Sequence, residues 1–600
     1  MKPDYTFAEH IRTEKIPRRH GKDFAGIFPF RTYLFLIILC LCIGLLVVKL
    51  ISTQLFQGDY YRALADSNRT RTRVIHAPRG IIFDRNGIPL VYNTPGYREL
   101  VNGKVVFLSK EQALDALVQG KRNIEIDSLR HYPFTDSMAH VLGYTGQITK
   151  EQLGTTAFSD YQPTDVVGEN GIEEQYEHQL RGTDGKQLLE VDALGNVVRT
   201  LGQTDPIAGQ NITTTLDSKL QVAAYNAIKT VNKGAVVISK PDGEILALVS
   251  QPSFDPNLFT LDQTYHVASD SAYKNVASVL LDGTSQPLLN RTISGTYPPG
   301  STFKIVTAAA GLQQKIIDDS WTIEDTGVLT IGKFSFANWY YTDYGRKEQG
   351  PVDVVRAIAR SNDIFFYKLA DKIGIDKLSN FAKTYGIGNT LGIDLPGEAS
   401  GVLPTEEWKK KNIGEDWYTG DTYEYGIGQG YLLTTPLQVN AWTDIVANGG
   451  TLYQPHLLLN DKLHIIHDNL LTKENHDLIQ KGMIDVCSPG GVAYPLFNFK
   501  VQNSNLKNEN DGLDFKAPDD ATSSANASDK NQTQITLACK TGTAQIGNAD
   551  TKADAWITVI APAYHPKIVV TVLVENGGEG SDVAAPIAKQ ILQEYFEKEQ

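Results

Sequence analysis

The longest apolar stretch of the sequence runs from Tyr33 to Val48 and continues through Leu50 and Ile51, beyond a single Lys49. About 20 apolar residues in a helix span a bilayer, and a lysine near the end of such a helix can extend its ammonium group to the interface. The preceding residues are basic, with Lys2, Arg12, Lys15, Arg18, Arg19, Lys22 and Arg31. The positive-inside rule therefore predicts a protein of the cell membrane with a cytoplasmic tail (1–32) and a transmembrane helix (33–52). The rest of the chain would be exported. A cleaved signal peptide is the alternative, but no A-x-A-like site follows Lys49.

Beyond the apolar run, the pattern changes to short alternating stretches. The runs 234–239 and 245–249 flank Pro241-Asp242-Gly243, which is typical of a β-hairpin. Residues 568–574 read as a buried strand near the end of the chain, followed by a helix from about Ala584. Strands at both ends with helices between them predict an α+β layer fold.

The same pattern suggests the domain organisation. Residues 53–206 read as mixed strands and short helices, a mixed α/β pedestal domain with little candidate chemistry, and residues 207–600 contain the α+β domain. Within the latter, 501–534 is rich in Asn, Ser, Asp and Lys and almost lacks large apolar residues. We predict that this segment is a polar insertion, disordered or mobile.

Composition narrows the function classes. The net charge of −13, with no basic stripe and no glycine-rich phosphate loop, argues against a nucleic-acid partner. The 12 histidines are scattered and form no His/Cys cluster, so we expect no metal and no cofactor. Cys40 and Cys42 lie in the apolar run and read as packing residues. Cys487 and Cys539 lie in the exported part, where a disulfide is permitted, but two cysteines do not establish that they pair.

A serine nucleophile is indicated at Ser301, three residues before Lys304. The S-x-x-K pattern also occurs at Ser271…Lys274 and Ser504…Lys507. The residues around each serine therefore decide which match is the nucleophile. Ser301 follows Pro298-Pro299-Gly300 and begins an Ala-rich apolar run, which predicts a buried helix starting at the serine. On that helix, positions i and i+3 share a face, so Lys304 lies beside the hydroxyl. The two decoys have no such setting and read as ordinary surface residues.

Further residues complete the expected chemistry. A serine hydroxyl needs a base, and lysine serves only if burial or a neighbouring cation keeps it neutral. Lys304 would be that base, Lys540 the neighbouring cation, and Ser361 a proton relay. The strand 535–539 leads into Lys540 and Thr541, which would bind a substrate carboxylate, and Gly542 would let a ligand backbone approach. The amides of Ser301 and Thr543 are the candidate oxyanion donors.

The three motifs S-x-x-K, S-x-x and K-T-G, in this order, are known from penicillin-binding proteins and serine β-lactamases. The chain resembles the class B penicillin-binding proteins, the monofunctional peptidoglycan DD-transpeptidases. The resemblance covers nearly the whole chain and rests also on Arg79–Gly87, Gly171–Glu177, Gly428-Gln429-Gly430, Thr435–Gln438, Lys540–Gln545 and Ser581–Pro586. The Thr435–Gln438 tetrapeptide is in addition a capping box with proline at the first helical position.

This resemblance implies a transpeptidase domain with an antiparallel five-stranded sheet covered by helices on both faces. It implies a serine acyl-enzyme that cross-links peptidoglycan stem peptides with release of D-alanine and is inhibited by β-lactams. A SEDS-family glycan polymerase is the partner that such pedestals imply. Arg79, Asp84 and Arg85 of the pedestal motif are expected to form structural ion pairs rather than a catalytic site.

The second motif departs from the usual Ser-x-Asn. Read in frame with Phe365-Phe366-Tyr367, its third position is Asp363, which resembles the elongation-type members of the class. Two alternatives stay open: Asn362 could be the asparagine of the family motif, or Asn362-Asp363 could be a helix-capping pair. A carboxylate beside Lys304 would raise the pKa of the lysine unless Lys540 offsets it.

Rival functions are a septal transpeptidase, a membrane-bound β-lactam sensor or scaffold, and a DD-carboxypeptidase or β-lactamase. The large pedestal disfavours the hydrolases. A sensor would carry a sizeable cytoplasmic domain, whereas only the tail 1–32 precedes the apolar run.

Overall fold

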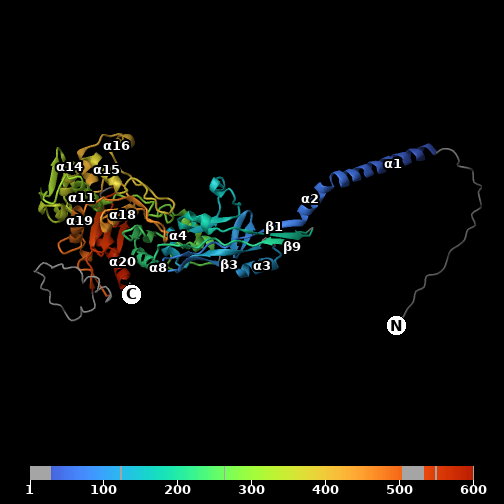
Figure 1. Cartoon of the computed structure of the whole chain (residues 1–600), viewed down its shortest axis with the longest axis horizontal. Coiled ribbons are helices and arrows are strands. Elements are labelled where there is room, and N and C mark those ends of the chain that lie inside the picture. The colour runs from blue at the N-terminus through green and yellow to red at the C-terminus, as the bar shows by residue number, and fades with distance from the viewer. Residues whose placement is uncertain are drawn as a thin grey trace, which may run out of the picture. The chain divides into compact units, whose positions relative to one another are not determined.

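The computed structural model describes residues 29–121, 124–192, 194–262, 264–502, 533–547 and 551–598. The basic tail before residue 29 and most of the predicted polar insertion lie outside these ranges. The chain divides into two compact units, coloured by residue number in Figure 1: one takes residues up to Val74 with Lys186–Thr204, and the other takes Ile75–Gly185 with Asp205 onward. The pedestal boundary expected at residue 206 stays a prediction, because most of the predicted pedestal belongs to the same compact unit as the α+β domain.

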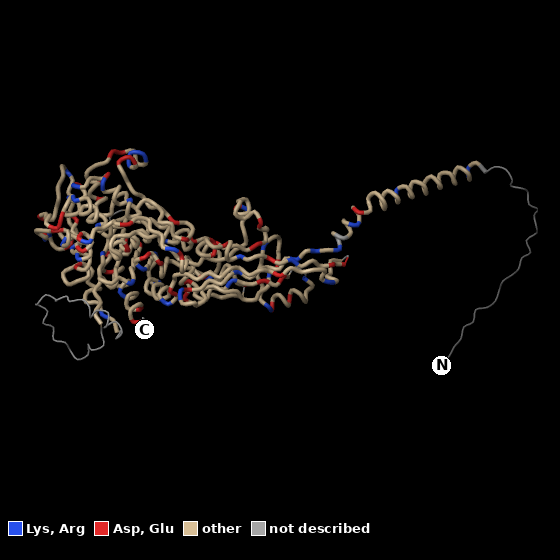
Figure 2. Tube along the Cα trace, viewed as in Figure 1, with Lys and Arg blue, Asp and Glu red and all other residues tan. Residues whose placement is uncertain are grey.

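The first unit begins with the predicted apolar helix. Helix α1 covers Pro29–Ile51 and passes into a π-helical turn at Ser52–Phe56. The span Phe30–Phe56 is long and apolar enough to cross a membrane, and Figure 2 shows its small number of charged positions. Helix α2 (Gly58–Arg69) follows, and β1 (Thr70–Ile75), β8 (Gly185–Val191) and β9 (Val197–Thr204) form a three-stranded sheet in the order β1-β8-β9.

The second unit opens with a mixed α/β region, as predicted for the pedestal. Its main sheet has the order β10-β2-β3-β4, with β5 also paired to β3, and a second pair joins β6 to β7. The strands are β2 (Ile82–Phe83), β3 (Pro89–Val101), β4 (Lys104–Leu108), β5 (Ile124–His131), β6 (Tyr144–Gln147), β7 (Val166–Glu169) and β10 (Ile212–Thr213). The helices are α3 (Lys110–Val118), α4 (Ala139–Leu142), α5 (Lys150–Leu153), α6 (Gly171–Gln175) and α7 (Glu177–Leu180).

The two pedestal motifs, Arg79–Gly87 and Gly171–Glu177, form ion pairs with each other. The Arg79 guanidinium bridges two carboxylates of the second motif, with 2.7 Å from Nη2 to Glu173 Oε2 and 2.7 Å from Nη1 to Glu177 Oε2. Asp84 accepts hydrogen bonds from its own turn and from Ser218 Oγ at 2.7 Å, and Arg85 pairs with Glu244. The expected structural role of Arg79, Asp84 and Arg85 is confirmed.

The larger part of the second unit is built on the five-stranded sheet, in the order β12-β11-β23-β22-β21, with every neighbouring pair antiparallel. Its strands are β11 (Gly234–Ser239), β12 (Ile245–Gln251), β21 (Ala538–Ala544), β22 (Asp554–Ala561) and β23 (Ile568–Val574). The predicted hairpin 234–249 and the predicted strand 568–574 are confirmed. The strand predicted at 535–539 is shifted: β21 begins at Ala538 and contains Lys540–Thr543, because these residues pair in register with β22.

Helices cover both faces of this sheet. Helices α8 (Ser218–Ile228) and α20 (Ala585–Lys598) pack on each other and on the sheet, and lie close together in Figure 1. Helix α18 (Pro436–Asn448) begins with the predicted Thr435–Gln438 capping box and packs on β11, β22 and β23. Further helices are α11 (Lys304–Gln313), α13 (Val354–Ala359), α14 (Asp363–Ile373), α15 (Ile375–Thr384), α16 (Glu406–Asn412), α17 (Thr419–Gly426) and α19 (Lys473–Val486).

The limits predicted for the polar insertion need a correction. Val501 is buried and belongs to β19 (Lys500–Val501), which pairs with β20 (Thr533–Gln534). The ends of the predicted segment are therefore ordered strands packed on the domain. Residues 503–532, including the decoy Ser504…Lys507, lie outside the described residues.

Candidate active site

The first motif occupies a tight turn rather than the first turn of an α-helix. Gly300–Phe303 is a 3-10 turn and α11 begins at Lys304. In a 3-10 turn, side chains at i and i+3 eclipse each other, so the turn places Ser301 one turn before Lys304, and a direct contact between their side chains stays a prediction. Gly300 has φ +54°, and a Cβ there would lie 3.0 Å from Thr543 O. The turn thus packs directly against the strand of the third motif.

Lys304 is buried and hydrogen-bonded to the second motif. Its Nζ donates to Asp363 Oδ1 at 2.6 Å, to Ser361 O at 2.8 Å and to Ser361 Oγ at 3.3 Å. Burial lowers the pKa of Lys304, while the Asp363 charge and its hydrogen bond oppose that shift. The net direction is the one that a lysine base requires.

Ser361 lies where the three motifs meet. It joins α13 to α14 with φ +51°, a left-handed conformation that is costly for a residue with a side chain. Its Oγ accepts a hydrogen bond from Lys540 Nζ at 2.8 Å, in addition to the contact from Lys304. The strained turn therefore holds one hydroxyl between two lysines.

Asp363 and Asn362 point in different directions. Asp363 contacts Lys304 through Oδ1 and accepts from Trp339 N through Oδ2 at 2.9 Å. The Asn362 oxygen caps α14 by accepting from the amide of Phe365, and its Nδ2 donates to Asp325 at 2.6 Å. This geometry favours the frame Ser361-x-Asp363, and it also bears out the capping interpretation for Asn362.

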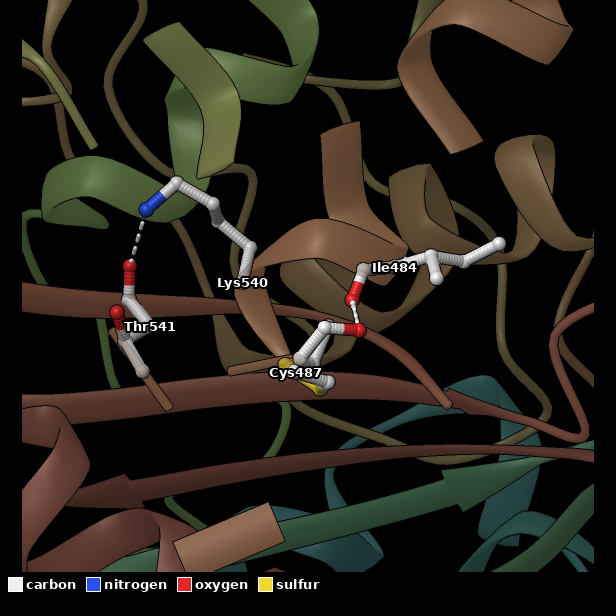
Figure 3. The surroundings of a disulfide bond; sticks show 6 residues. Ile484, Cys487, Lys540 and Thr541 are labelled. Carbon is white, nitrogen blue, oxygen red and sulfur yellow. Dashed lines mark hydrogen bonds between the residues drawn. A yellow bond between two sulfur atoms is a disulfide. The ribbon is translucent and has the colours of Figure 1, made fainter. Parts of the chain in front are cut away.

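The third motif lies on the edge strand of the sheet. Lys540 is buried, and its Nζ donates to Thr541 O at 2.9 Å (Figure 3). The same Nζ also donates to Ser361 Oγ. Burial and the nearby charge of Lys304 lower the pKa of Lys540 well below its ordinary value. Thr541 is buried beside it, and Thr543 Oγ1 donates to Glu579 Oε2 at 2.8 Å.

Gly542 has a role that the sequence did not indicate. A Cβ at this position would lie 3.0 Å from Pro299 O and 3.1 Å from both Thr302 Cγ2 and Trp556 Cβ. The absent side chain thus admits the turn that carries Ser301, whereas we expected it to admit a ligand backbone.

Comparison with known proteins identifies the family of this arrangement. Residues 233–593 match the penicillin binding protein transpeptidase domain, and residues 118–214 match the penicillin-binding protein dimerisation domain. The chain belongs to the penicillin-binding protein transpeptidases. Among its relatives, the peptidoglycan D,D-transpeptidase MrdA of Haemophilus influenzae is 31% identical over 97% of this chain and 93% of its own length. The MrdA protein of Escherichia coli K12 is 31% identical over 95% and 94%.

Solved penicillin-binding protein 2 structures agree. The Helicobacter pylori protein in complex with MreC has a TM-score of 0.69 at 28% identity, covering 88% of this chain and 98% of that chain. The Pseudomonas aeruginosa protein with WCK 5153 has a TM-score of 0.65 at 33% identity, covering 88% and 97%. A peptidoglycan synthase complex that coordinates polymerisation and cross-linking contains a chain with a TM-score of 0.67 at 26% identity, covering 94% and 98%. This penicillin-binding protein is a peptidoglycan D,D-transpeptidase, and its apolar N-terminal helix makes it a single-pass membrane protein.

Some residues around the motifs of this penicillin-binding protein were missed. Trp339 and Asp325 support the second motif, and Gln429 Nε2 donates to Thr543 O at 3.2 Å. Gln429 lies in the Gly428-Gln429-Gly430 motif and could have been assigned to the site from it. Trp339 and Asp325 lie in no recognisable motif, and only folding brings them to α14.

The alternative S-x-x-K pair, Ser271 and Lys274, forms hydrogen bonds of its own. Ser271 Oγ donates to Asp136 and to Tyr273 O. Lys274 Nζ donates to two nearby carbonyl oxygens, those of Ala268 and Ser269. Ser271 is buried, so the expectation that it lies on the surface is wrong, whereas Lys274 is exposed as expected.

The pairing of Cys487 and Cys539, left open by the sequence, is settled by the structure. Cys487 and Cys539 form a disulfide with Cα atoms 5.9 Å apart, while Cys40 and Cys42 are free on α1. Among the described residues, no group of three or more His, Cys, Asp or Glu side chains could hold a metal ion.

Proposed function

We propose that Ser301 is the nucleophile that attacks the D-Ala-D-Ala carbonyl of a peptidoglycan stem peptide. Its oxygen forms an ester with the penultimate residue, and terminal D-alanine leaves with the proton that the serine gave up. An amine of a second stem peptide then attacks the ester, forms the cross-link and restores the serine. The observation that carries this proposal is the convergence of both lysines on Ser361 beside the Ser301 turn.

Each neighbouring group has a role in this scheme. Lys304 in its neutral form takes the Ser301 proton, and its lowered pKa supports that role. Ser361 relays the proton between Lys304 and the leaving amine, and Asp363 orients the Lys304 ammonium that forms. The amides of Ser301 and Thr543 would stabilise the oxyanion.

Substrate binding is assigned to the third motif. Lys540, Thr541, Gly542 and Thr543 lie on β21, the last strand in the sheet order. An edge strand can pair with an extended peptide through its backbone, and a terminal carboxylate would reach Lys540 and Thr541. β-Lactams would acylate Ser301 by the same route.

The orientation in the membrane follows from two observations. The tail before the apolar helix is basic, and the disulfide Cys487–Cys539 belongs to the part that follows the helix. Since disulfides persist in oxidising compartments, they support an extracytoplasmic catalytic domain and a cytoplasmic N-terminus.

The cellular role is assigned from the relatives. The Ser361-x-Asp363 frame and the MrdA relatives support cell-wall elongation. The Helicobacter pylori relative forms a complex with MreC, and another structural neighbour belongs to a peptidoglycan synthase complex. These neighbours support a partner that polymerises glycan strands, which we infer to be a SEDS-family polymerase.

The test is covalent labelling with a fluorescent penicillin, followed by incubation with a D-Ala-D-Ala peptide donor and a D-amino acid acceptor. Ser301→Ala should abolish the labelled adduct, and Ser271→Ala is the matched control that keeps it. Exchange of the acceptor into the peptide supports a transpeptidase. Hydrolysis alone would indicate a carboxypeptidase or β-lactamase, and a stable adduct without peptide turnover would indicate a sensor or scaffold.

A further inference from the structure

The disulfide lies next to the catalytic machinery. Cys539 precedes Lys540 on β21, and Cys487 is the residue at which α19 ends. Both cysteines are buried. In Figure 3 the Lys540 side chain leads away from the sulfur atoms, and its amine reaches the carbonyl of Thr541.

The disulfide links α19 to β21, which is an edge strand of the five-stranded sheet. Among the described residues, β21 pairs with β22 on one side and with no strand on the other. Backbone hydrogen bonds of the sheet therefore hold only one side of an edge strand. Strand β21 also packs against α19 and the Ser301 turn, and the disulfide is the covalent link to α19.

The partner helix of the disulfide also supports the second motif. Helix α19 packs closely on α13, since a Cβ on Gly482 would lie 2.8 Å from Ile358 Cβ. Arg360 directly follows α13 and precedes Ser361, and its guanidinium donates to Gly490 O in the loop that follows Cys487.

These contacts form a closed ring. It runs from Cys539 to Lys540, through the 2.8 Å hydrogen bond from Lys540 Nζ to Ser361 Oγ, to Arg360, to the loop at Gly490 and back to Cys487. We propose that the Cys487–Cys539 disulfide is a positioning element of the transpeptidase reaction, which holds Lys540 at the Ser361 hydroxyl. This inference rests on the proposed function of Ser301 and its neighbours.

The experiment measures the rate constant of acylation by saturating fluorescent penicillin on the full-length protein in detergent. The background is Cys40→Ser/Cys42→Ser, which leaves the disulfide as the single cysteine pair and should react at the wild-type rate. In that background, Cys487→Ala/Cys539→Ala should slow acylation by about tenfold or more, the scale expected for small misplacements of reacting groups. The comparison is made well below the melting temperature, with complete labelling of the folded protein.

Chemical reduction gives the same comparison without a substitution. Reduction of the folded Cys40→Ser/Cys42→Ser protein, followed by thiol counting, should lower the rate by a similar factor, and reoxidation should restore it. The Cys487→Ala/Cys539→Ala variant in the same background should not respond to reductant.

A pH profile separates positioning from simple stabilisation. The charge of Lys304 lowers the pKa of Lys540, so moving Lys540 away from Lys304 should raise the pKa of Lys540 and shift the acylation profile along the pH axis. An unchanged rate and profile with only a lower melting temperature would overturn the proposal. If the proposed function itself were wrong, the oxidised wild-type protein would form no Ser301-dependent adduct. That outcome differs from an unchanged acylation rate.

Discussion

Ser361 has a left-handed backbone, a conformation that few residues with side chains adopt. The cost of this conformation, of order 1–3 kcal/mol, persists only where the surroundings hold it. Here the surroundings are Asn362, which caps α14 and binds the buried Asp325, and two lysines that donate to the Ser361 hydroxyl. Strain at one residue thus coincides with the point where the three motifs converge.

Lys304 is expected to act in its neutral form. Lys304→Arg should abolish penicillin acylation while the domain stays folded, because arginine keeps its proton at any accessible pH. The adduct is measured by gel fluorescence and folding by circular dichroism. Wild-type labelling rates in Lys304→Arg would remove the lysine from the base role.

The side chains of Asp363 and Asn362 point in different directions, so replacing each of them should impair a different property. Asp363→Ala should slow acylation by about 10²-fold or more, the usual scale for a positioned orienting or proton-transfer group. Asn362→Ala should mainly lower the melting temperature, since loss of a helix cap costs about 1 kcal/mol and leaves Asp325 without one of its donors. Acylation rates of both variants are compared at equal folded fraction. A larger rate defect for Asn362→Ala would contradict the Ser361-x-Asp363 frame.

At the scale of elements, the site is formed by the packing of an edge strand on a 3-10 turn. Strand β21 and the turn Gly300–Phe303 come within van der Waals contact at Gly300 and Gly542. The absent side chains of both glycines allow this approach, since a Cβ on Gly300 would lie 3.0–3.3 Å from backbone atoms of Thr543. The oxyanion donors proposed here therefore depend on how closely the two elements pack.

Gly542→Ala tests this packing. The added methyl group would press on Pro299 O, Thr302 and Trp556 at 3.0–3.1 Å, so the turn that carries Ser301 should shift by a few tenths of an ångström. We expect acylation to slow by about tenfold, since rates depend steeply on the alignment of reacting atoms. Stopped-flow labelling measures it. Gly283→Ala is the control, because a Cβ there has open space, and equal rates for the two variants would show that the contact does not matter.

At the scale of the whole molecule, the pedestal region 75–185 and the catalytic region share one compact unit. Polar contacts join them at several places: Tyr176 OH donates to Asp394 Oδ2 at 2.6 Å, and Gln221 Nε2 donates to Ser137 O at 2.7 Å. His140 of α4 lies 2.7 Å from Pro287 O through its Nε2. These long-range bonds predict that the two regions unfold together.

The buried His140 makes this stability dependent on pH. Burial lowers the pKa of His140 from 6.5 to about 4, against the opposing effect of the Pro287 carbonyl. Between these values the unfolded chain binds the proton more readily, so the free energy of unfolding should fall as pH falls from about 6.5 to 4, by about 3 kcal/mol. His140→Gln should lose that part of the acid sensitivity, as measured by denaturant unfolding at pH 7 and pH 4.5. An identical pH dependence in the variant would contradict this assignment.

Local signals in the sequence were sufficient to identify much of this protein. The apolar run, the hairpin 234–249, the strand 568–574 and the Thr435 capping box depend on residues close in the chain. Ser301 was separated from its decoys by its Pro-Pro-Gly approach and apolar helix, which are also local. These signals predicted the α+β fold, the membrane helix and the serine motif.

Tertiary structure decided what depends on residues distant in the chain. Lys304 meets Ser361 and Asp363 across 57 and 59 residues, and Lys540 meets Ser361 across 179. The cysteine pairing, the contact that requires Gly542 and the support of Asn362 by Asp325 depend on packing of this kind. Periodicity and propensity report the neighbours along the chain, whereas burial and hydrogen-bond partners are set by which elements the fold brings together.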